Sequence, residues 1–269
     1  MSKNDFKVLT DIEHILLRPG MYIGSTSLEE KEHFVLGKYV KTVYTAGAIK
    51  CISEILDNSL DQFIRSNGTN SNKIDIKING NVVTITDNGS GIPNDLIPDL
   101  DGVEKYRGFL AWTKTKSGSN FSDDGRKTVG FNGVGSSLTN IFSKRFVGTS
   151  NDGNSILTVI CTDNCSNTNW SIVKKKSKNT GVTVEFELDL PRFGLTTIDD
   201  THISIIEDRL TSVSAIFPGI SFTLNGIPIK HTIKTYASLY SDNTILHEGD
   251  LCSWFVFPNE DGDAKINAF

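Results

Sequence analysis

Hydrophobic residues recur at helical spacing from about Ala46 to Arg65, which predicts an amphipathic helix. Two segments with period-two alternation follow, KIDIKI and VVTIT, and they flank Asn79-Gly80-Asn81 as a β-hairpin would. After a short helix predicted at SSLTNIFS come four strand-like runs, RFVGTS, ILTVICT, NWSIV and VTVEFEL. This order of elements indicates an α+β sandwich, with helices on one face of a mixed sheet.

A second unit is predicted from about Leu195. A helix over about 199–215 leads to ISFTLNGIPIK, in which Asn225-Gly226 predicts another hairpin turn. Strand-like runs at CSWFVF and AKINAF end the chain. We therefore expect one domain over 1–194 and a truncated second α/β domain over 195–269.

Segment 88–135 breaks the regular pattern, because it is rich in glycine, serine and charged residues and has only a short apolar patch at 109–112. A long stretch without periodicity inside a compact domain is usually a lid or a binding loop. We expect a lid over about 100–135.

Composition narrows the class of protein. The chain has 269 residues, of which 38% are hydrophobic and 22% charged, as is typical of a globular protein. Its net charge of -5 argues against a chain that binds polyanions over its whole surface. A lysine cluster remains at Lys174, Lys175, Lys176 and Lys178, although such runs are more often solvated loops than DNA-binding surfaces.

Cellular location and metal content follow from equally simple patterns. No apolar run approaches the roughly 20 residues that span a bilayer, and the N-terminal stretch carries charges, so we expect a cytoplasmic protein with no membrane partner. Cys161 and Cys165 lie four positions apart, but no second cysteine pair or nearby histidine completes a zinc site.

Three polar residues, Glu54, Asn58 and Asp61, fall on one face of the first helix, opposite its apolar stripe. A solvated polar face is the simplest interpretation. However, the position four residues after Glu54 is not basic, so we expect no helical ion pair for this carboxylate. An amide one turn from a carboxylate is suited to hold a hydrated cation and to activate a water molecule.

Two glycine-rich segments could approach a ligand closely. In Thr86–Pro93, Asp87 ends a predicted strand and the following glycines permit a tight bend, although a plain turn is an alternative. In Val129–Ser137, glycines precede a helix and would expose N–H groups at its positive end, which suits phosphate; a flexible hinge is the alternative. This second segment lacks the Lys-Ser or Lys-Thr of a P-loop, and no parallel βαβ unit leads into it.

In chain order, a helical E-x-x-x-N-x-x-D, a D-x-G-x-G after a strand and a lid ending in G-x-x-G-x-G resemble the GHKL ATPase superfamily of gyrase, Hsp90, histidine kinases and MutL. Further stretches are similar to type IIA DNA topoisomerases, above all to the ATPase subunit of T-even-type bacteriophage enzymes: RPGMYIGS, EILDNSLD, GFNGVGSSLTNIFS, FTLNGIPIK and KTYASLY. The resemblance covers essentially the whole chain. It implies a GHKL (Bergerat) domain over 1–194, with an N-terminal strap at 1–35 and an ATP lid at about 100–135, followed by a truncated transducer domain over 195–269.

The resemblance also implies ATP and Mg²⁺ as cofactors and a role for each motif residue. Glu54 is expected to be the general base, Asn58 the magnesium ligand, and Asp61 a carboxylate that pairs within the site. Asp87 is expected to accept the adenine amino proton. The remaining expected nucleotide contacts are Gly89, Gly91, Ile92 and Pro93 at the adenine, Ser119 and Asn120 at the ribose and phosphate, and Asn132, Gly133, Val134 and Gly135 at the β- and γ-phosphates.

Three features depart from the family pattern. Val182 stands where relatives carry a threonine that supports the adenine site, and Thr180 and Thr183 flank it, so this role stays unassigned. Phe131 replaces a basic residue of cellular eukaryotic relatives. The transducer lysine that reaches the γ-phosphate is expected beyond Phe269. We therefore expect this chain to bind nucleotide and to hydrolyse it slowly.

The function implied is ATP hydrolysis that drives dimer closure and gates DNA strand passage. The implied partners are a second copy bound through the strap, DNA, and the other topoisomerase subunits, in the cytoplasm of an infected bacterium. Tyr22 and Ile23 are expected to be exposed apolar groups of the strap in a monomer; packing on their own sheet is the alternative. Other GHKL activities, a chaperone-like ATPase or a kinase, and a non-hydrolysing nucleotide-binding module are the alternative functions. No histidine lies in a phosphoacceptor setting, and the presence of Glu54 beside Asn58 argues against a non-hydrolysing module.

Overall fold

The computed structural model describes residues 7–117, 134–240, 245–248, 253–258 and 264–268, with side chains described up to residue 240. Its centre is an eight-stranded sheet. The spatial order of the strands is β12 (Ile227–Ile229), β11 (Ser221–Leu224), β3 (Lys73–Asn79), β4 (Val82–Asp87), β10 (Gly181–Leu188), β7 (Ser143–Asn151), β8 (Ser155–Thr162) and β9 (Asn167–Lys174). β11 runs parallel to β3 and the other neighbours are antiparallel, so the sheet is mixed, as predicted.

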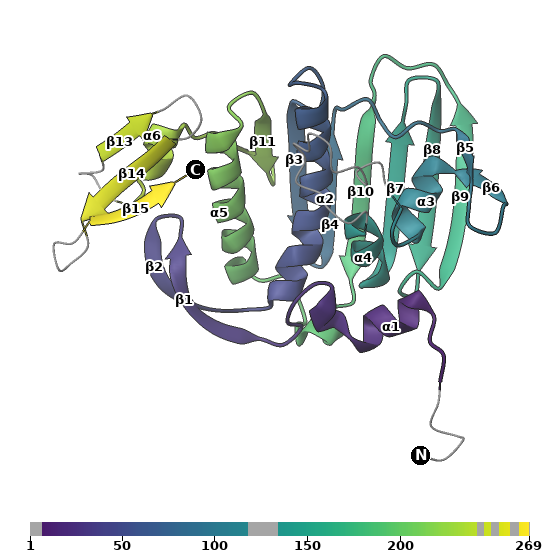
Figure 1. Ribbon diagram of the computed structural model, residues 1–269, viewed down its shortest axis with the longest axis horizontal. Coiled ribbons are helices and arrows are strands. Elements are labelled where there is room, and N and C mark those ends of the chain that lie inside the picture. The colour runs from purple at the N-terminus through teal and green to yellow at the C-terminus, as the bar shows by residue number, and fades with distance from the viewer. Residues whose placement is uncertain (1–6, 118–133, 241–244, 249–252, 259–263, 269) are drawn as a thin grey trace.

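Four helices cover one face of this sheet: α2 (Ala46–Arg65), α3 (Arg107–Thr113), α4 (Gly135–Ile141) and α5 (Asp200–Ile216). Figure 1 shows α2, α3 and α4 in front of the strands, with α5 beside α2. Along β4 and most of β10, buried residues alternate with half-buried ones, so that Val83 and Ile85 of β4 face the helices together with Phe186 of β10. The predicted α+β sandwich is confirmed.

The segment expected to be without structure after the first hairpin is partly ordered. It contains β5 (Leu96–Pro98), β6 (Glu104–Tyr106) and α3, and only 118–133 lies outside the described residues. The short apolar patch explains this order, because Trp112 is 2% exposed and fills the space above Gly148. A Cβ on Gly148 would lie 2.5 Å from the Trp112 ring, so the glycine is needed for this contact.

The eight-stranded sheet continues across the expected boundary between residues 194 and 195. After the short 3₁₀ helix η2 (Leu190–Phe193), α5 contributes Ile206 and Leu210 to the same hydrophobic core as α2. β11 and β12 then extend the sheet, because Ser221–Leu224 pairs with Lys73–Ile76. The chain goes on through α6 (Ile233–Ala237) to a separate three-stranded sheet of β13 (Ile245–Glu248), β14 (Ser253–Pro258) and β15 (Ala264–Ala268).

The N-terminal region lies at one end of the helical layer. It consists of α1 (Asp11–Leu17), the 3₁₀ helix η1 (Pro19–Met21) and the hairpin of β1 (Glu29–Val35) and β2 (Lys38–Tyr44). Ile23 is 3% exposed and belongs to the core, and Tyr22 is half-buried with its hydroxyl 2.9 Å from His14 Nδ1. The expected exposure of this apolar pair is therefore wrong, because Ile23 packs within its own domain. Among the described residues, no helix is long and apolar enough to cross a membrane.

Candidate functional site

Helix α2 carries the first group of predicted site residues. Its apolar side faces the sheet, and Glu54 and Asn58 lie one turn apart on the side that the sheet does not cover. The Glu54 side chain is 18% exposed and Asn58 is exposed, whereas Asp61 is 2% exposed. Asp61 thus lies deeper than a solvated polar face would place it. Glu54 and Asn58 remain accessible to a ligand.

The expectation that Glu54 has no ion-pair partner on its helix is wrong. Lys50 lies one turn earlier and its ammonium group forms a salt bridge with Glu54 Oε1. The pairing cation lies four positions before Glu54, whereas the expectation rested on the residue four positions after it. A lysine in this place fixes the direction in which the carboxylate points.

The last glycine of the predicted phosphate loop lies directly against this carboxylate. Gly135 is the first residue of α4, and a Cβ there would fall 1.9 Å from Glu54 Oε2. The two helices are also joined where Thr139 Oγ1 donates to the Cys51 carbonyl at 2.8 Å. The sequence motifs on α2 and α4 are therefore in contact, as the resemblance requires, and any side chain at their junction would displace the Glu54 carboxylate.

Asp87 forms the second part of the site, at the end of β4. It is 8% exposed and accepts three hydrogen bonds: from Ser59 Oγ at 2.9 Å, from the Gly89 N–H at 2.8 Å and from the Val182 N–H at 3.3 Å. Burial raises the pKa of Asp87, and the three donors act in the opposite direction. The carboxylate is thus held in one orientation by α2, by its own bend and by β10.

The bend after Asp87 requires its glycines. Gly91 has a φ of +74°, and a Cβ there would meet the Asn151 carbonyl at 2.3 Å. The carbonyl of Gly89 accepts a 2.6 Å hydrogen bond from Thr180 Oγ1. Ile92 is held by Ser150 Oγ, which accepts from its N–H and donates to its carbonyl, both at 2.8 Å. Pro93 is exposed.

The three candidates around the missing adenine-site threonine occupy different places. Thr183 pairs with Thr86, their hydroxyls 3.2 Å apart, on the sheet face that the helices do not cover. Val182 lies on the helix-covered side beside Asp87 and packs against the core. Thr180 contacts the glycine bend. Neither Thr180 nor Ser59 could be assigned from sequence, because both contacts depend on how distant segments fold together.

Asp57, also missed from sequence, anchors the site helix to α5. It is 7% exposed and accepts a 2.5 Å hydrogen bond from Arg209 Nη2. Together with Lys50 these residues line a cavity of about 510 Å³ between α2, α5 and the N-terminal region. Other predicted ligands, namely Ser119, Asn120, Asn132 and Gly133, lie outside the described residues, whereas Val134 is the half-buried N-cap of α4.

The geometry brings an acidic helix, an acidic bend and a helix N-terminus together on one side of the sheet. Glu54 can polarise a water molecule, Asn58 can offer an amide oxygen to a hard cation, and Asp87 can accept a proton from a ligand amine. Among the described residues, no group of three or more histidine, cysteine, aspartate or glutamate side chains could hold a metal ion. Mg²⁺ usually keeps waters and phosphate oxygens as most of its ligands, so a single protein ligand fits this ion.

Comparison with known proteins places this arrangement in a family. The model of the histidine kinase-, DNA gyrase B- and HSP90-like ATPases matches residues 45–192, which contain α2, the glycine bend and α4. The chain is 42% identical over 267 residues to the DNA topoisomerase large subunit of Enterobacteria phage T4, covering 99% of this chain and 51% of that subunit. It is 30% identical over 248 residues to DNA topoisomerase 2 of Candida glabrata, covering 87% of this chain and 17% of that protein.

Solved structures agree with these sequence matches. The ATPase and transducer domains of DNA topoisomerase II from Balamuthia mandrillaris superpose with a TM-score of 0.87 and 25% identity, over 97% of this chain and 70% of that one. The ATPase region of Saccharomyces cerevisiae topoisomerase II has the same fold, with a TM-score of 0.88 and 24% identity over 96% of this chain and 72% of that one. The resemblance and the fold class inferred from the motifs are confirmed, and the chain belongs to the family of histidine kinase-, DNA gyrase B- and HSP90-like ATPases.

Proposed function

We propose that this chain is the ATPase region of a type II DNA topoisomerase and that it binds and hydrolyses ATP with Mg²⁺. The chain spans about half the length of the phage subunit and less of the cellular enzymes, so the activity proposed for the whole protein rests on those relatives. The observation that carries the proposal is the contact of Gly135 with Glu54, because it brings the phosphate-loop motif onto the proposed general base.

Adenine binding is assigned to Asp87 and the bend that follows it. The buried carboxylate accepts the exocyclic amino proton, and its three protein donors keep it from rotating away. Gly89 and Gly91 let the base approach the backbone, with Ile92 and Pro93 on its apolar side. Val182 supplies a backbone donor to Asp87 at the position where the family pattern has a threonine, and Thr180 stiffens the bend.

Hydrolysis is assigned to Glu54. Its carboxylate, oriented by Lys50, accepts a proton from the attacking water. Asn58 lies one turn further along α2, about 6 Å at 1.5 Å per residue, and is the proposed magnesium ligand. Bound Mg²⁺ neutralises phosphate charge. The N–H groups at the start of α4 face the phosphates, together with Asn132, Gly133 and Val134, while Ser119 and Asn120 contact the ribose and a phosphate. Asp61 supports the site from the buried side of α2.

The proposal extends to the whole enzyme. Nucleotide binding closes a dimer through residues 1–35, the lid at about 100–135 covers the nucleotide, and the unit from 195 onward carries the change towards bound DNA. DNA and further topoisomerase subunits are the proposed partners, in the cytoplasm of an infected bacterial cell. Hydrolysis by this chain alone is proposed to be slow.

Two measurements test this function. Sedimentation velocity with a non-hydrolysable ATP analogue and Mg²⁺ is expected to show a shift from monomer to dimer, which Glu54→Ala retains and Asp87→Asn loses. Steady-state ATP turnover is expected to fall about 100- to 10,000-fold in Glu54→Ala, as is typical when a general base is removed. A chain that hydrolyses ATP equally well without Glu54 would contradict the assignment of the general base. A chain that binds nucleotide and stays monomeric would contradict the proposed dimer closure but not the proposed nucleotide site.

A further inference from the structure

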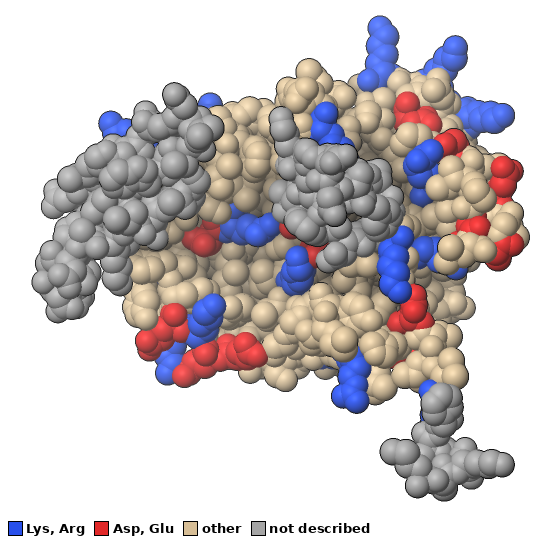
Figure 2. Space-filling model, viewed as in Figure 1, with Lys and Arg blue, Asp and Glu red and all other residues tan. Residues whose placement is uncertain are grey.

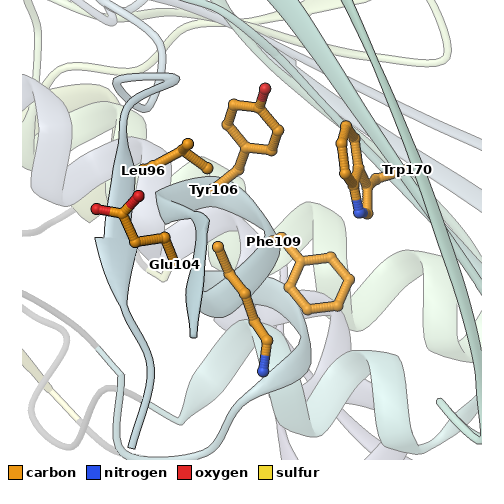
Figure 3. Close-up of a pocket in the computed structure, with 6 residues that line it drawn as sticks. Leu96, Glu104, Tyr106, Phe109 and Trp170 are labelled. Atoms are coloured by element: carbon orange, nitrogen blue, oxygen red, sulfur yellow. The ribbon is translucent and has the colours of Figure 1, made fainter. Parts of the chain in front are cut away.

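A second hollow lies away from the nucleotide site, at the edge of the sheet. It has a volume of about 300 Å³ and lies between the β5–β6 hairpin, α3 and β9. Figure 3 shows Leu96, Tyr106, Phe109 and Trp170 around it, with the carboxylate of Glu104 at one side. This volume is at the lower end for ligand pockets, roughly 300–1,000 Å³, and suits one large side chain better than a whole cofactor. None of the residues assigned above to contact the nucleotide lines it, although residues 104–109 fall at the start of the segment proposed as the lid.

The cavity is apolar but open to solvent. Trp170 is 49% exposed and Leu96 is 48% exposed, although side chains of this type are usually well buried. The indole is held in place by Tyr106, whose ring meets it edge to face with centroids 4.9 Å apart. A fixed, half-exposed tryptophan beside an apolar hollow is a common feature of protein-binding surfaces.

The same tryptophan belongs to an unguarded edge strand. β9 pairs with β8 on one side and, among the described residues, with no strand on the other, because the β5–β6 hairpin forms its own two-stranded sheet. Its residues from Asn167 to Val173 include no charged residue and no proline, which are two features that usually prevent an edge strand from pairing with another chain. All of them except Ile172 are exposed. The edge can therefore accept another extended segment through backbone hydrogen bonds.

Charge selects the kind of segment that would bind. β9 ends at Lys174 and runs into Lys175, Lys176 and Lys178; all four are exposed, and no ion pair joins them to another described residue. Figure 2 shows basic side chains projecting at the upper right, where the end of β9 and the start of β10 lie in Figure 1. Lys174 lies four positions after Trp170, so both side chains face the same side of the strand.

We propose that the edge of β9 and its cavity bind an extended acidic segment of a partner protein by strand addition. One large apolar side chain of that segment enters the cavity beside Trp170. In the antiparallel arrangement, acidic residues about four positions before this anchor meet the lysines. Nucleic acid fits less well, because the hollow is lined mainly by apolar side chains and suits an apolar anchor better than a phosphate.

The test is a selection of phage-displayed random 12-residue peptides on the folded protein, followed by binding of the synthetic consensus peptide measured by fluorescence anisotropy. The expected consensus alternates apolar and polar positions, with an aromatic anchor preceded by acidic residues. Trp170→Ala is expected to weaken its binding about tenfold or more. Lys174→Glu with Lys176→Glu is expected to weaken it and to reduce its salt dependence, while Lys38→Glu with Lys144→Glu, at exposed lysines on β2 and β7, is the charge-matched control.

Two further readouts separate strand addition from simple adhesion. Backbone N-methylation of alternate residues of the peptide is expected to abolish binding without changing its side chains. Thermal melting monitored by circular dichroism checks that Trp170→Ala, a change at a half-exposed position, leaves the fold intact. The proposal is overturned if no peptide is enriched, if the consensus peptide binds Trp170→Ala equally well, or if N-methylation has no effect on binding. It is also overturned if a 20-base-pair DNA duplex displaces the peptide and the lysine reversals abolish binding of that duplex.

Discussion

Replacing Gly135 by alanine tests how the site positions its general base. The backbone of Gly135 has no positive φ, so alanine is conformationally allowed there. Its Cβ, however, would lie 1.9 Å from Glu54 Oε2, where ordinary contacts begin at 3.4 Å. The carboxylate must therefore retreat by about 1.5 Å, either away from the attacking water or out of its salt bridge with Lys50.

The expected effect is mainly catalytic. A misplacement of about 1 Å can cost roughly 100-fold in rate, which corresponds to about 2.7 kcal/mol of transition-state free energy. Folding is expected to change less, because overpacking costs about 1–3 kcal/mol while replacing glycine in a helix regains up to about 1 kcal/mol. ATP affinity, set mostly by the adenine pocket, is expected to stay within a few-fold.

The assay is steady-state ATP turnover combined with equilibrium nucleotide binding, for the two single variants and their combination. In a Glu54→Ala background, Gly135→Ala is expected to cause no further loss, because the group it displaces is already gone. If Gly135→Ala keeps the wild-type kcat, or if its effect adds fully to that of Glu54→Ala, then the reasoning that links this glycine to the carboxylate is refuted.

Three other outcomes follow from contacts in the described residues. Thr180→Val removes the 2.6 Å hydrogen bond to the Gly89 carbonyl and is expected to weaken ATP binding about fivefold, because such a hydrogen bond contributes about 1 kcal/mol. Calorimetry with Thr183→Val as the control measures this, and equal effects of the two variants would contradict it. The Thr45 N–H donates to His202 Nε2 at 3.1 Å, and His202→Leu leaves it without an acceptor. The free energy of unfolding in urea is therefore expected to fall by about 1–3 kcal/mol, and an unchanged midpoint of urea unfolding would refute this. A hydrogen bond from Lys105 lowers the pKa of Asp99 to about 2, so the stability that this pair gives the β5–β6 hairpin is present above pH 3.8 and is lost as the pH falls through about 2. We expect Trp170 fluorescence to change in this pH range in the wild type and not in Asp99→Asn. Identical titrations of the two proteins would count against the pair.

The local pattern of hydrophobic and turn residues was sufficient to predict the helix and the hairpin that hold the site. The helix over Ala46–Arg65 and the hairpin around Gly80 follow from periodicity and turn residues, and both are confirmed. Asp87 and Gly89 could be singled out because their motif is contiguous in sequence. The ion pair of Lys50 with Glu54 could also have been predicted, since Lys50 lies one helical turn before Glu54.

What escaped prediction depends on contacts between distant segments. The donors to Asp87 include Ser59 and the Val182 N–H, which lie 28 and 95 positions away in the chain and meet it only in the folded sheet. The parallel pairing of β11 with β3 is equally non-local, so sequence alone placed β11 in a second unit. The β5–β6 hairpin has strands of three residues in a polar segment, too short to show alternation.

The most direct test of the nucleotide site is isothermal titration calorimetry with a non-hydrolysable ATP analogue and Mg²⁺ on three proteins: wild type, Asp87→Asn and Glu54→Ala. Asparagine preserves the size of Asp87 but replaces one acceptor oxygen by a donor, so it opposes the adenine amino group. We expect the wild type and Glu54→Ala to bind with similar affinity and Asp87→Asn to show no measurable binding. Tight binding by Asp87→Asn, or loss of binding in Glu54→Ala alone, would contradict the assignment of the two carboxylates to base recognition and to hydrolysis.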